Sequence, residues 1–121
     1  MLLNDFFYIR QLDTADSTIK ASLSINKTHK IFGGHFPSIP IVPGVCMMQM
    51  MREVVEKHTN KKLLIRSGDN VKFLSVINPT ENSEVDATIQ YEETSEGFKI
   101  NATLFAGATI FFKLKAVLQS T

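Results

Sequence analysis

The fold is decided by residues 35–58, which read HFPSIPIVPGVCMMQMMREVVEKH. The stretch begins with a lone histidine and three prolines and then becomes almost entirely apolar. Proline near the first helical position is preorganised for helix entry, and the basic pair Lys57 and His58 suits the negative C-terminal end of a helix. We therefore expect one helix from about Pro43 to His58, with His35 held beside its N-terminus.

The expected helix is apolar on every side between Val45 and Met51, where Gln49 is the one polar residue. A helix that is apolar all round is a buried helix. We expect it to reach solvent beyond this stretch, at its charged residues Arg52, Glu53, Glu56 and Lys57.

Much of the remaining sequence alternates apolar and polar residues with the period of a β-strand. The alternation is clear from Ser17 to Asn26 and returns over residues 85–91, 98–104 and 110–118. The last three segments are joined by short connections that contain turn residues such as Gly97 and Gly107. Short connections of this kind predict an antiparallel meander.

Two more strands are expected outside the meander, from Leu63 to Ile77 and, as a short first strand, from Phe6 to Gln11. One buried helix among five or six strands predicts an α+β fold. In this arrangement a curled antiparallel sheet wraps one central helix. The surplus of strands argues against helix bundles and Rossmann folds.

The chain has 121 residues, which fits a single domain over residues 1–121 with no linker. A domain of this size would bury more surface by pairing with a second copy. Lys plus Arg number 13 and Asp plus Glu number 12, so the net charge of +1 gives no electrostatic reason to expect nucleic acid or an anionic membrane as a partner.

The cysteine content and the N-terminal sequence predict a cytoplasmic protein. Cys46 is the single cysteine and cannot form an internal disulfide, so nothing indicates export. The first residues lack the basic region and the long apolar run of a signal peptide, and no stretch approaches membrane-spanning length.

Two stretches of the chain carry a resemblance to a known family. The run Gly34-His35-Phe36-Pro37, followed by Pro40 and by Pro43-Gly44-Val45, resembles the signature of the hot-dog-fold 3-hydroxyacyl-[acyl-carrier-protein] dehydratases of fatty acid synthesis. Val71-Lys72-Phe73, followed by Pro79, resembles the central strand of that family and the loop after it. The match in order and length covers nearly the whole chain, and the spacing of the histidine, prolines and glycine is rather specific.

The resemblance implies a homodimer or a dimer of dimers, with two active sites at the subunit interface and an acyl tunnel along the helix. It implies that His35 is the base at the substrate α-carbon and that the backbone N–H of Gly44 binds the thioester carbonyl. Removal of the α-proton builds negative charge on that oxygen, which a helix N-terminus stabilises. The implied substrate-binding residues are Phe36, Pro43, Val45 and Met48. We expect an acyl carrier protein or coenzyme A thioester as substrate, no cofactor and no metal.

The third functional position departs from the family pattern. The family has Glu or Asp fourteen positions after the histidine, contributed across the dimer, whereas this chain has Gln49. A carboxamide donates a hydrogen bond but has no acidic proton to give to a leaving hydroxyl. Ser38 also replaces the glycine that usually follows His-Phe-Pro. Burying an unpartnered amide costs about 1–3 kcal/mol, so Gln49 is expected to have a hydrogen-bond partner.

Several of these residues also have a purely structural interpretation. The methionines at 47, 48, 50 and 51 are either core residues or, in part, tunnel-lining residues. Cys46 is interpreted as a small buried hydrophobic residue and not as a nucleophile. His29 and His58 are interpreted as surface residues, and His29 with His35 gives too few ligands for a zinc site.

Three functions from different classes remain open. The first is dehydration of 3-hydroxyacyl thioesters, with His35 transferring the proton and Gln49 orienting the leaving hydroxyl. The second is a hot-dog thioesterase, in which Gln49 positions water. The third is a non-catalytic acyl-binding subunit that completes a heterodimer with a carboxylate-bearing partner. The missing carboxylate weakens the second, and the intact His35 argues against the third.

Overall fold

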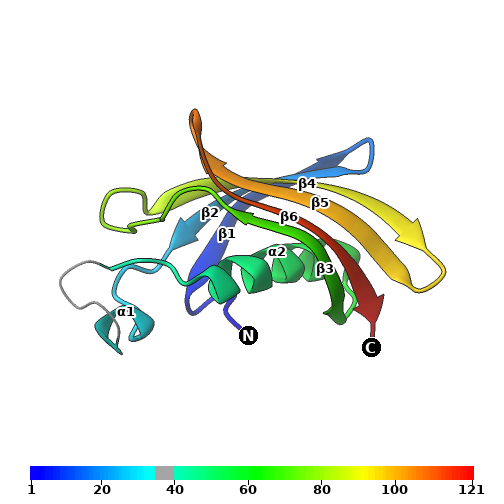
Figure 1. Ribbon diagram of the computed structural model, residues 1–121, viewed down its shortest axis with the longest axis horizontal. Coiled ribbons are helices and arrows are strands. Elements are labelled where there is room, and N and C mark those ends of the chain that lie inside the picture. Colours follow the sequence, from blue (N-terminus) through cyan, green and yellow to red (C-terminus); the bar gives the residue numbers. More distant parts are fainter. Residues whose placement is uncertain (35–39) are drawn as a thin grey trace.

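The expected curled sheet around one helix is confirmed (Figure 1). The computed structural model describes residues 1–34 and 40–121. Its strands form one six-stranded antiparallel sheet in the order β1-β2-β4-β5-β6-β3. The strands are β1 (Phe7–Ala15), β2 (Thr18–Ile25), β3 (Leu63–Phe73), β4 (Glu84–Thr94), β5 (Gly97–Ala106) and β6 (Thr109–Ser120). The helices are the single turn α1 (Ile31–Gly34), which we did not predict, and α2 (Gly44–Thr59).

Helix α2 lies within one residue of its predicted bounds. Pro43 is the N-cap, with φ −62° and ψ 145°, so the proline stands just before the first helical residue. At the other end Asn60 adopts the left-handed conformation and its N–H donates to the Glu56 carbonyl at 2.8 Å. Among the described residues, no helix is both long and apolar enough to cross a lipid bilayer.

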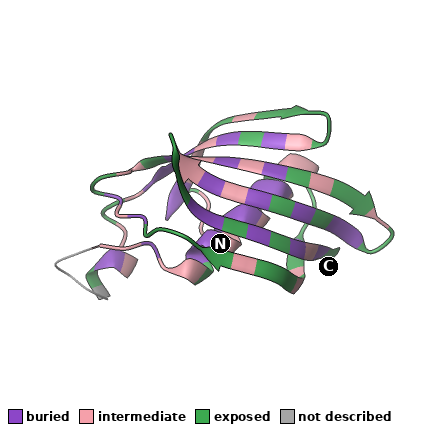
Figure 2. Ribbon diagram, turned by 45° about the horizontal axis from the view of Figure 1, so that its top comes forward, coloured by how far each residue is buried: buried purple, intermediate pink, exposed green. Residues whose placement is uncertain are grey.

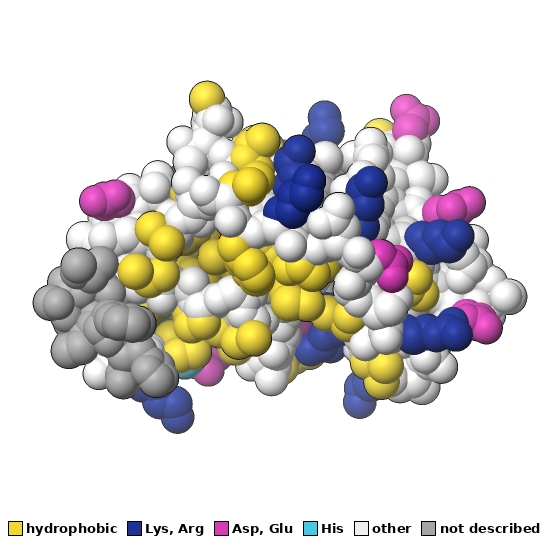
Figure 3. All heavy atoms as spheres, in the orientation of Figure 1, with side chains coloured by type: hydrophobic (Ala, Val, Ile, Leu, Met, Phe, Trp, Pro, Cys, Tyr) yellow, Lys and Arg dark blue, Asp and Glu magenta, His cyan; other side chains and the backbone are white. Residues whose placement is uncertain are grey.

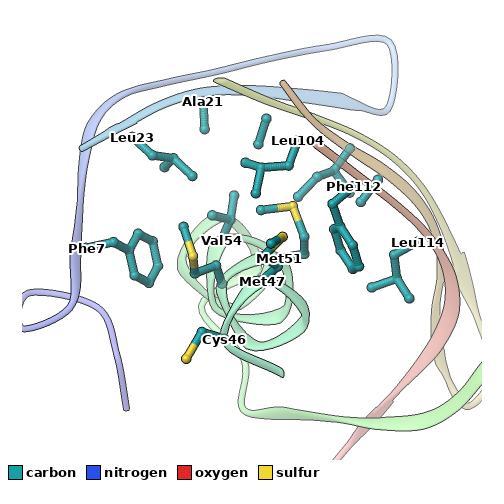
Figure 4. Packing of buried hydrophobic residues seen from close by; sticks show 14 of the residues in the cluster. Phe7, Ala21, Leu23, Cys46, Met47, Met51, Val54, Leu104, Phe112 and Leu114 are labelled. Carbon is teal, nitrogen blue, oxygen red and sulfur yellow. The ribbon is translucent and has the colours of Figure 1, made fainter. Parts of the chain in front are cut away.

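The alternating apolar residues of β2, β4, β5 and β6 form the core with one face of α2. Figure 2 shows this alternation as bands of buried and exposed residues along the strands. Figure 4 shows how Met47, Met51 and Val54 of the helix point toward Leu104 and Phe112 of the sheet. The hairpin between β4 and β5 requires Gly97, since a Cβ there would lie 1.9 Å from the Leu118 carbonyl oxygen.

Two predicted strand ends and one predicted core residue were wrong, and a β-bulge explains the error at the core residue. The first strand runs four residues beyond Gln11, and β3 ends at Phe73 instead of Ile77. Ile110, predicted to face the core, is exposed. The register of β5 and β6 shifts between Leu104 and Phe105, so an extra residue on β6 interrupts the alternation just before Phe112.

The burial of α2 also differs from the prediction. Val45 is 74% exposed and Met48 and Gln49 are half-buried, so the helix leaves one side of its first turns uncovered in the single chain. Glu53, expected in solvent, is 1% exposed. The apolar run was misleading because periodicity alone does not show which side of an all-apolar segment meets the sheet.

Candidate active site at the N-terminus of α2

The first turn of α2 offers backbone donors at the positive end of the helix dipole. The intrahelical hydrogen bonds begin at Cys46, whose N–H donates to the Pro43 carbonyl at 3.0 Å. Within the described residues, the N–H groups of Gly44 and Val45 have no hydrogen-bond partner. Free N–H groups at a helix N-terminus favour a negatively charged or polarised oxygen. The structure therefore gives Gly44 the surroundings that an oxyanion-binding N–H requires.

The aromatic ring of Phe73 covers Gly44. A Cβ added at Gly44 would lie 2.6 Å from Phe73 Cε1 and 2.8 Å from Phe73 Cζ, so no larger residue fits without moving the ring. The ring also packs against Phe112 of β6, with centroids 5.1 Å apart. Phe73 was not among the predicted site residues. Phe73 ends a strand that follows the helix in the chain, so spacing alone could not pair it with Gly44.

An apolar groove opens beside this helix end. Its volume is about 500 Å³, and it runs between the segment that leads into α2 and the segment that follows β3. The residues that line it are Ile41, Val42, Pro43, Gly44, Met47, Phe73, Leu74, Ser75 and Val76. Figure 3 shows hydrophobic side chains gathered in a band across this face of the molecule. A hydrocarbon chain fits such a lining.

The predicted substrate-binding residues differ in how they contribute to this groove. Pro43 lines it, whereas Val45 points away from the core into solvent. Met48 is half-buried and its methyl group lies beside Gly68 of β3. The other three methionines of the helix, at 47, 50 and 51, are buried core residues, and Met47 also reaches the groove.

Gln49 has a hydrogen-bond partner, as predicted for a buried amide. Its Nε2 donates to Glu53 Oε2 at 2.8 Å, one helical turn further on. The Glu53 carboxylate also accepts from two backbone N–H groups of the N-terminal segment: Leu2 at 3.0 and 2.9 Å and Leu3 at 2.8 Å. This network explains why Glu53 is buried and not exposed as predicted.

Two further expectations concern side chains near the site. Cys46 is buried, and burial raises the pKa of its thiol above the ordinary value of 9.0, as expected of an unreactive hydrophobic residue. His29 and His58 are not the surface residues that we expected. The His29 ring packs edge-on against Phe6 at 5.3 Å, and His58 lies within hydrogen-bond distance of the Tyr91 hydroxyl at 3.1 Å.

His35 and Phe36 lie outside the described residues. The base and one of the predicted substrate-binding residues therefore have no geometry here, and their roles remain predictions. Among the described residues, the structure brings Gly44, Pro43 and Phe73 together at the groove and places Gln49 farther along the same helix.

Comparison with known proteins identifies the family. A family model described as ApeI-like, ApeI dehydratase, matches residues 11–109. The chain belongs to the ApeI-like dehydratase family. Among curated relatives of this ApeI-like chain, a 3-hydroxyacyl-[acyl-carrier-protein] dehydratase FabZ from Lactococcus lactis subsp. cremoris is 35% identical over 77 residues, which cover 58% of this chain and 54% of that protein. The FabZ dehydratase of Streptococcus pneumoniae is 34% identical over 95 residues, which cover 73% of this chain and 65% of that protein.

Solved structures show that the ApeI-like chain has the hot-dog fold. The dehydratase heterocomplex ApeI:P from Xenorhabdus doucetiae superposes with a TM-score of 0.73 at 20% identity, over 92% of this chain and 96% of that one. An uncharacterised protein from Erwinia carotovora subsp. atroseptica gives a TM-score of 0.69 at 18% identity, over 93% and 92%. The matches span 54% and 65% of the lengths of the two curated relatives, which is less than two thirds of each.

Proposed function

We propose that this protein dehydrates 3-hydroxyacyl thioesters to 2-enoyl thioesters, with the acyl group carried by acyl carrier protein. The observation that carries the proposal is the N–H of Gly44, which has no hydrogen-bond partner among the described residues and lies at an apolar groove beside the Phe73 ring. This pairing of an oxyanion site with a hydrocarbon-binding surface suits an acyl thioester. The ApeI-like family match and the FabZ relatives support the same reaction.

In the proposed reaction the imidazole of His35 takes a proton from the α-carbon. The electron pair moves toward the carbonyl, and the N–H of Gly44 stabilises the oxygen as it becomes negative. The bond between carbon 3 and its hydroxyl then breaks as the carbon–carbon double bond forms. His35 returns its proton to the departing hydroxyl, so the products are the 2-enoyl thioester and one water.

We propose that the complete site forms between two subunits. Strand β3 stands at one end of the sheet order, so its outer edge has no strand partner within the described chain. Exposed apolar side chains accompany this edge and the nearby helix end: Val45, Leu64, Phe73, Leu74 and Val76. An unpaired edge beside an exposed apolar patch favours pairing with a second hot-dog subunit. We also expect the assembly to act in the cytoplasm.

Gln49 favours a second candidate, in which this protein is one subunit of a mixed assembly. Gln49 has no acidic proton, and the Glu53 side chain next to it is fully engaged by hydrogen bonds. The Xenorhabdus doucetiae neighbour is a heterocomplex. In this second candidate a partner subunit supplies the carboxylate, and this chain contributes the groove and the oxyanion site.

One experiment separates these functions. The purified protein is incubated with 3-hydroxyacyl and with simple acyl thioesters on carrier protein, and the masses of the products are determined. Loss of one water from the 3-hydroxyacyl substrate supports dehydration by this protein alone. Release of free acid instead identifies a thioesterase. No change in either substrate favours the subunit role, which predicts activity after a carboxylate-bearing hot-dog partner is added.

A further inference from the structure

The buried carboxylate of Glu53 is the basis of a further inference about how Gln49 works. Among the described residues, Glu53 is the one charged residue buried in the fold, at 1% exposed. Every hydrogen bond that it makes is accepted: two from the Leu2 N–H, one from the Leu3 N–H and one from Gln49 Nε2. Backbone donors cannot rotate, so they hold this carboxylate in one place.

A fixed acceptor next to Gln49 decides which way its carboxamide faces. An ionised carboxylate accepts hydrogen bonds but cannot donate one, so it binds the NH₂ end of the amide and repels the carbonyl end. The NH₂ and carbonyl ends of a glutamine side chain have nearly the same shape. A neighbouring group that can only accept hydrogen bonds therefore fixes which end faces it. One N–H of Gln49 is therefore committed to Glu53, and Oε1 is left without a partner among the described residues.

We propose that Glu53 is a positioning residue: it binds the NH₂ end of Gln49 and so leaves the carbonyl oxygen for the substrate hydroxyl, which in a site formed by two subunits would lie on the partly covered side of α2. Gln49 then accepts the O–H of the 3-hydroxyl group, and the lone pairs of that hydroxyl oxygen are left to receive the proton that it needs to depart as water. This inference rests on the proposed dehydration. It assigns Gln49 the role of an acceptor that orients the leaving group, and it removes Glu53 from the candidates for a general acid.

A carboxylate at position 49 would face the carboxylate of Glu53. In Gln49→Glu, the 2.8 Å hydrogen bond between Gln49 and Glu53 would become a contact between two carboxyl groups. Two negative charges at this distance repel each other, and a proton shared between the two carboxyl groups relieves the repulsion. That proton would lie between the two side chains and not at the substrate. The swapped variant Gln49→Glu/Glu53→Gln removes the repulsion, because the amide placed at position 53 donates to the carboxylate placed at position 49.

Steady-state kinetics test the positioning role. We expect Glu53→Gln to lower kcat by roughly tenfold or more with KM within about twofold, because a misplaced group costs turnover more than binding. The swapped variant should recover much of this loss, since an acceptor oxygen again faces the substrate. Glu56→Gln is the matched control: it removes the same charge from the same helix, where Glu56 binds the Leu63 N–H and Arg52.

The kinetic result overturns the inference if Glu53→Gln and Glu56→Gln have equal kcat values, or if the swapped variant is no better than Glu53→Gln. Thermal unfolding of each variant shows how much of any loss is due to stability. If Glu53 had a purely structural role, the loss of kcat in each variant would parallel the fall in its unfolding temperature, and the swapped variant would not recover kcat.

A second measurement does not depend on activity, so it separates failure of this inference from failure of the proposed function. The side-chain NH₂ resonances of Gln49 in ¹⁵N-labelled protein report its contact with Glu53. We expect one of the two protons to exchange slowly in the wild-type protein and this protection to be lost in Glu53→Ala, with the backbone spectrum otherwise preserved. Equal protection in both proteins would overturn the pairing.

Discussion

At the scale of single residues, the close contact with the Phe73 ring explains the glycine at position 44. The missing side chain leaves room for the Phe73 ring on one side and keeps the backbone N–H of the helix end open on the other. Glycine within a helix normally costs about 0.5–1 kcal/mol relative to alanine. Retaining it at the first helical position is explained by this close contact and not by helix stability.

Gly44→Ala is predicted to destabilise the fold by about 1–3 kcal/mol through overpacking against Phe73. The exposed Phe73 ring can partly move aside, which limits the loss. Without the Phe73 ring the overpacking is absent, so the double variant Gly44→Ala/Phe73→Ala should be no less stable than Phe73→Ala. Urea unfolding of the four proteins measures the coupling, and additive effects of the two substitutions would show that the contact is absent.

His35→Ala is predicted to abolish turnover and to leave the fold intact. A general base contributes typically 10²–10⁴-fold, so the rate should fall by at least about a hundredfold. Product formation and circular dichroism measure the two effects separately. Wild-type activity of this variant on every substrate that the protein accepts would remove His35 from the mechanism.

At the scale of elements, the two sides of α2 differ in how far they are buried. One side carries buried residues such as Cys46 and Val54 into the core. The other side carries Val45, Met48 and Gln49, which the single chain covers only in part. The helix is therefore packed into the core on one side, and its first turns stay partly uncovered on the other, where we propose that an acyl group or a partner subunit binds.

The buried side of α2 predicts an unreactive thiol at Cys46. Because burial raises its pKa, the thiol stays protonated in the fold at pH 8, and alkylation by iodoacetamide should be much slower in the native protein than in urea. Above pH 9.0 the unfolded chain loses this proton while the folded chain keeps it, so unfolding becomes more favourable.

The unfolding free energies of the wild type and of Cys46→Ala, measured from pH 7 to 10, check the second part. Their difference should be constant up to about pH 9 and should shift against the wild type at higher pH. Native alkylation as fast as in urea, or a difference that does not change with pH, would contradict the burial of the thiol.

The elements that the sequence predicted well are those with a local signal. The meander strands follow from period-2 alternation, and α2 follows from Pro43 and its apolar run. The burial of Glu53 could not be predicted, because its partners Leu2 and Leu3 lie about fifty residues away. The contact of Phe73 with Gly44 depends likewise on how β3 returns along the helix.

At the scale of the whole molecule, the open edge of β3 and the apolar surface beside it lie next to the candidate site. Exposed groups at this face include Phe73 and Val76, which also line the groove. A second subunit at this face would bury them and enclose the groove. The same face would then serve both assembly and substrate binding.

Light scattering at micromolar concentration is predicted to give at least twice the 13.6 kDa mass of one chain. Leu64→Lys, which places a charge on the exposed edge strand outside the groove, should shift the population toward monomer. Lys62→Ala, beside the start of the strand, is the control and should leave the mass unchanged. A wild-type protein that is monomeric throughout would contradict an active site built across two identical subunits.

The central claim is that this protein interconverts 3-hydroxyacyl and 2-enoyl thioesters, and the reverse reaction in D₂O tests it most directly. The purified protein is incubated with a 2-enoyl thioester on carrier protein, and the product is analysed by mass spectrometry and NMR, with His35→Ala as control. The account predicts a 3-hydroxyacyl thioester that has gained one water and carries one deuterium on carbon 2, formed by the wild type and not by the variant. Recovery of unchanged enoyl thioester, or release of free enoic acid, would contradict the account.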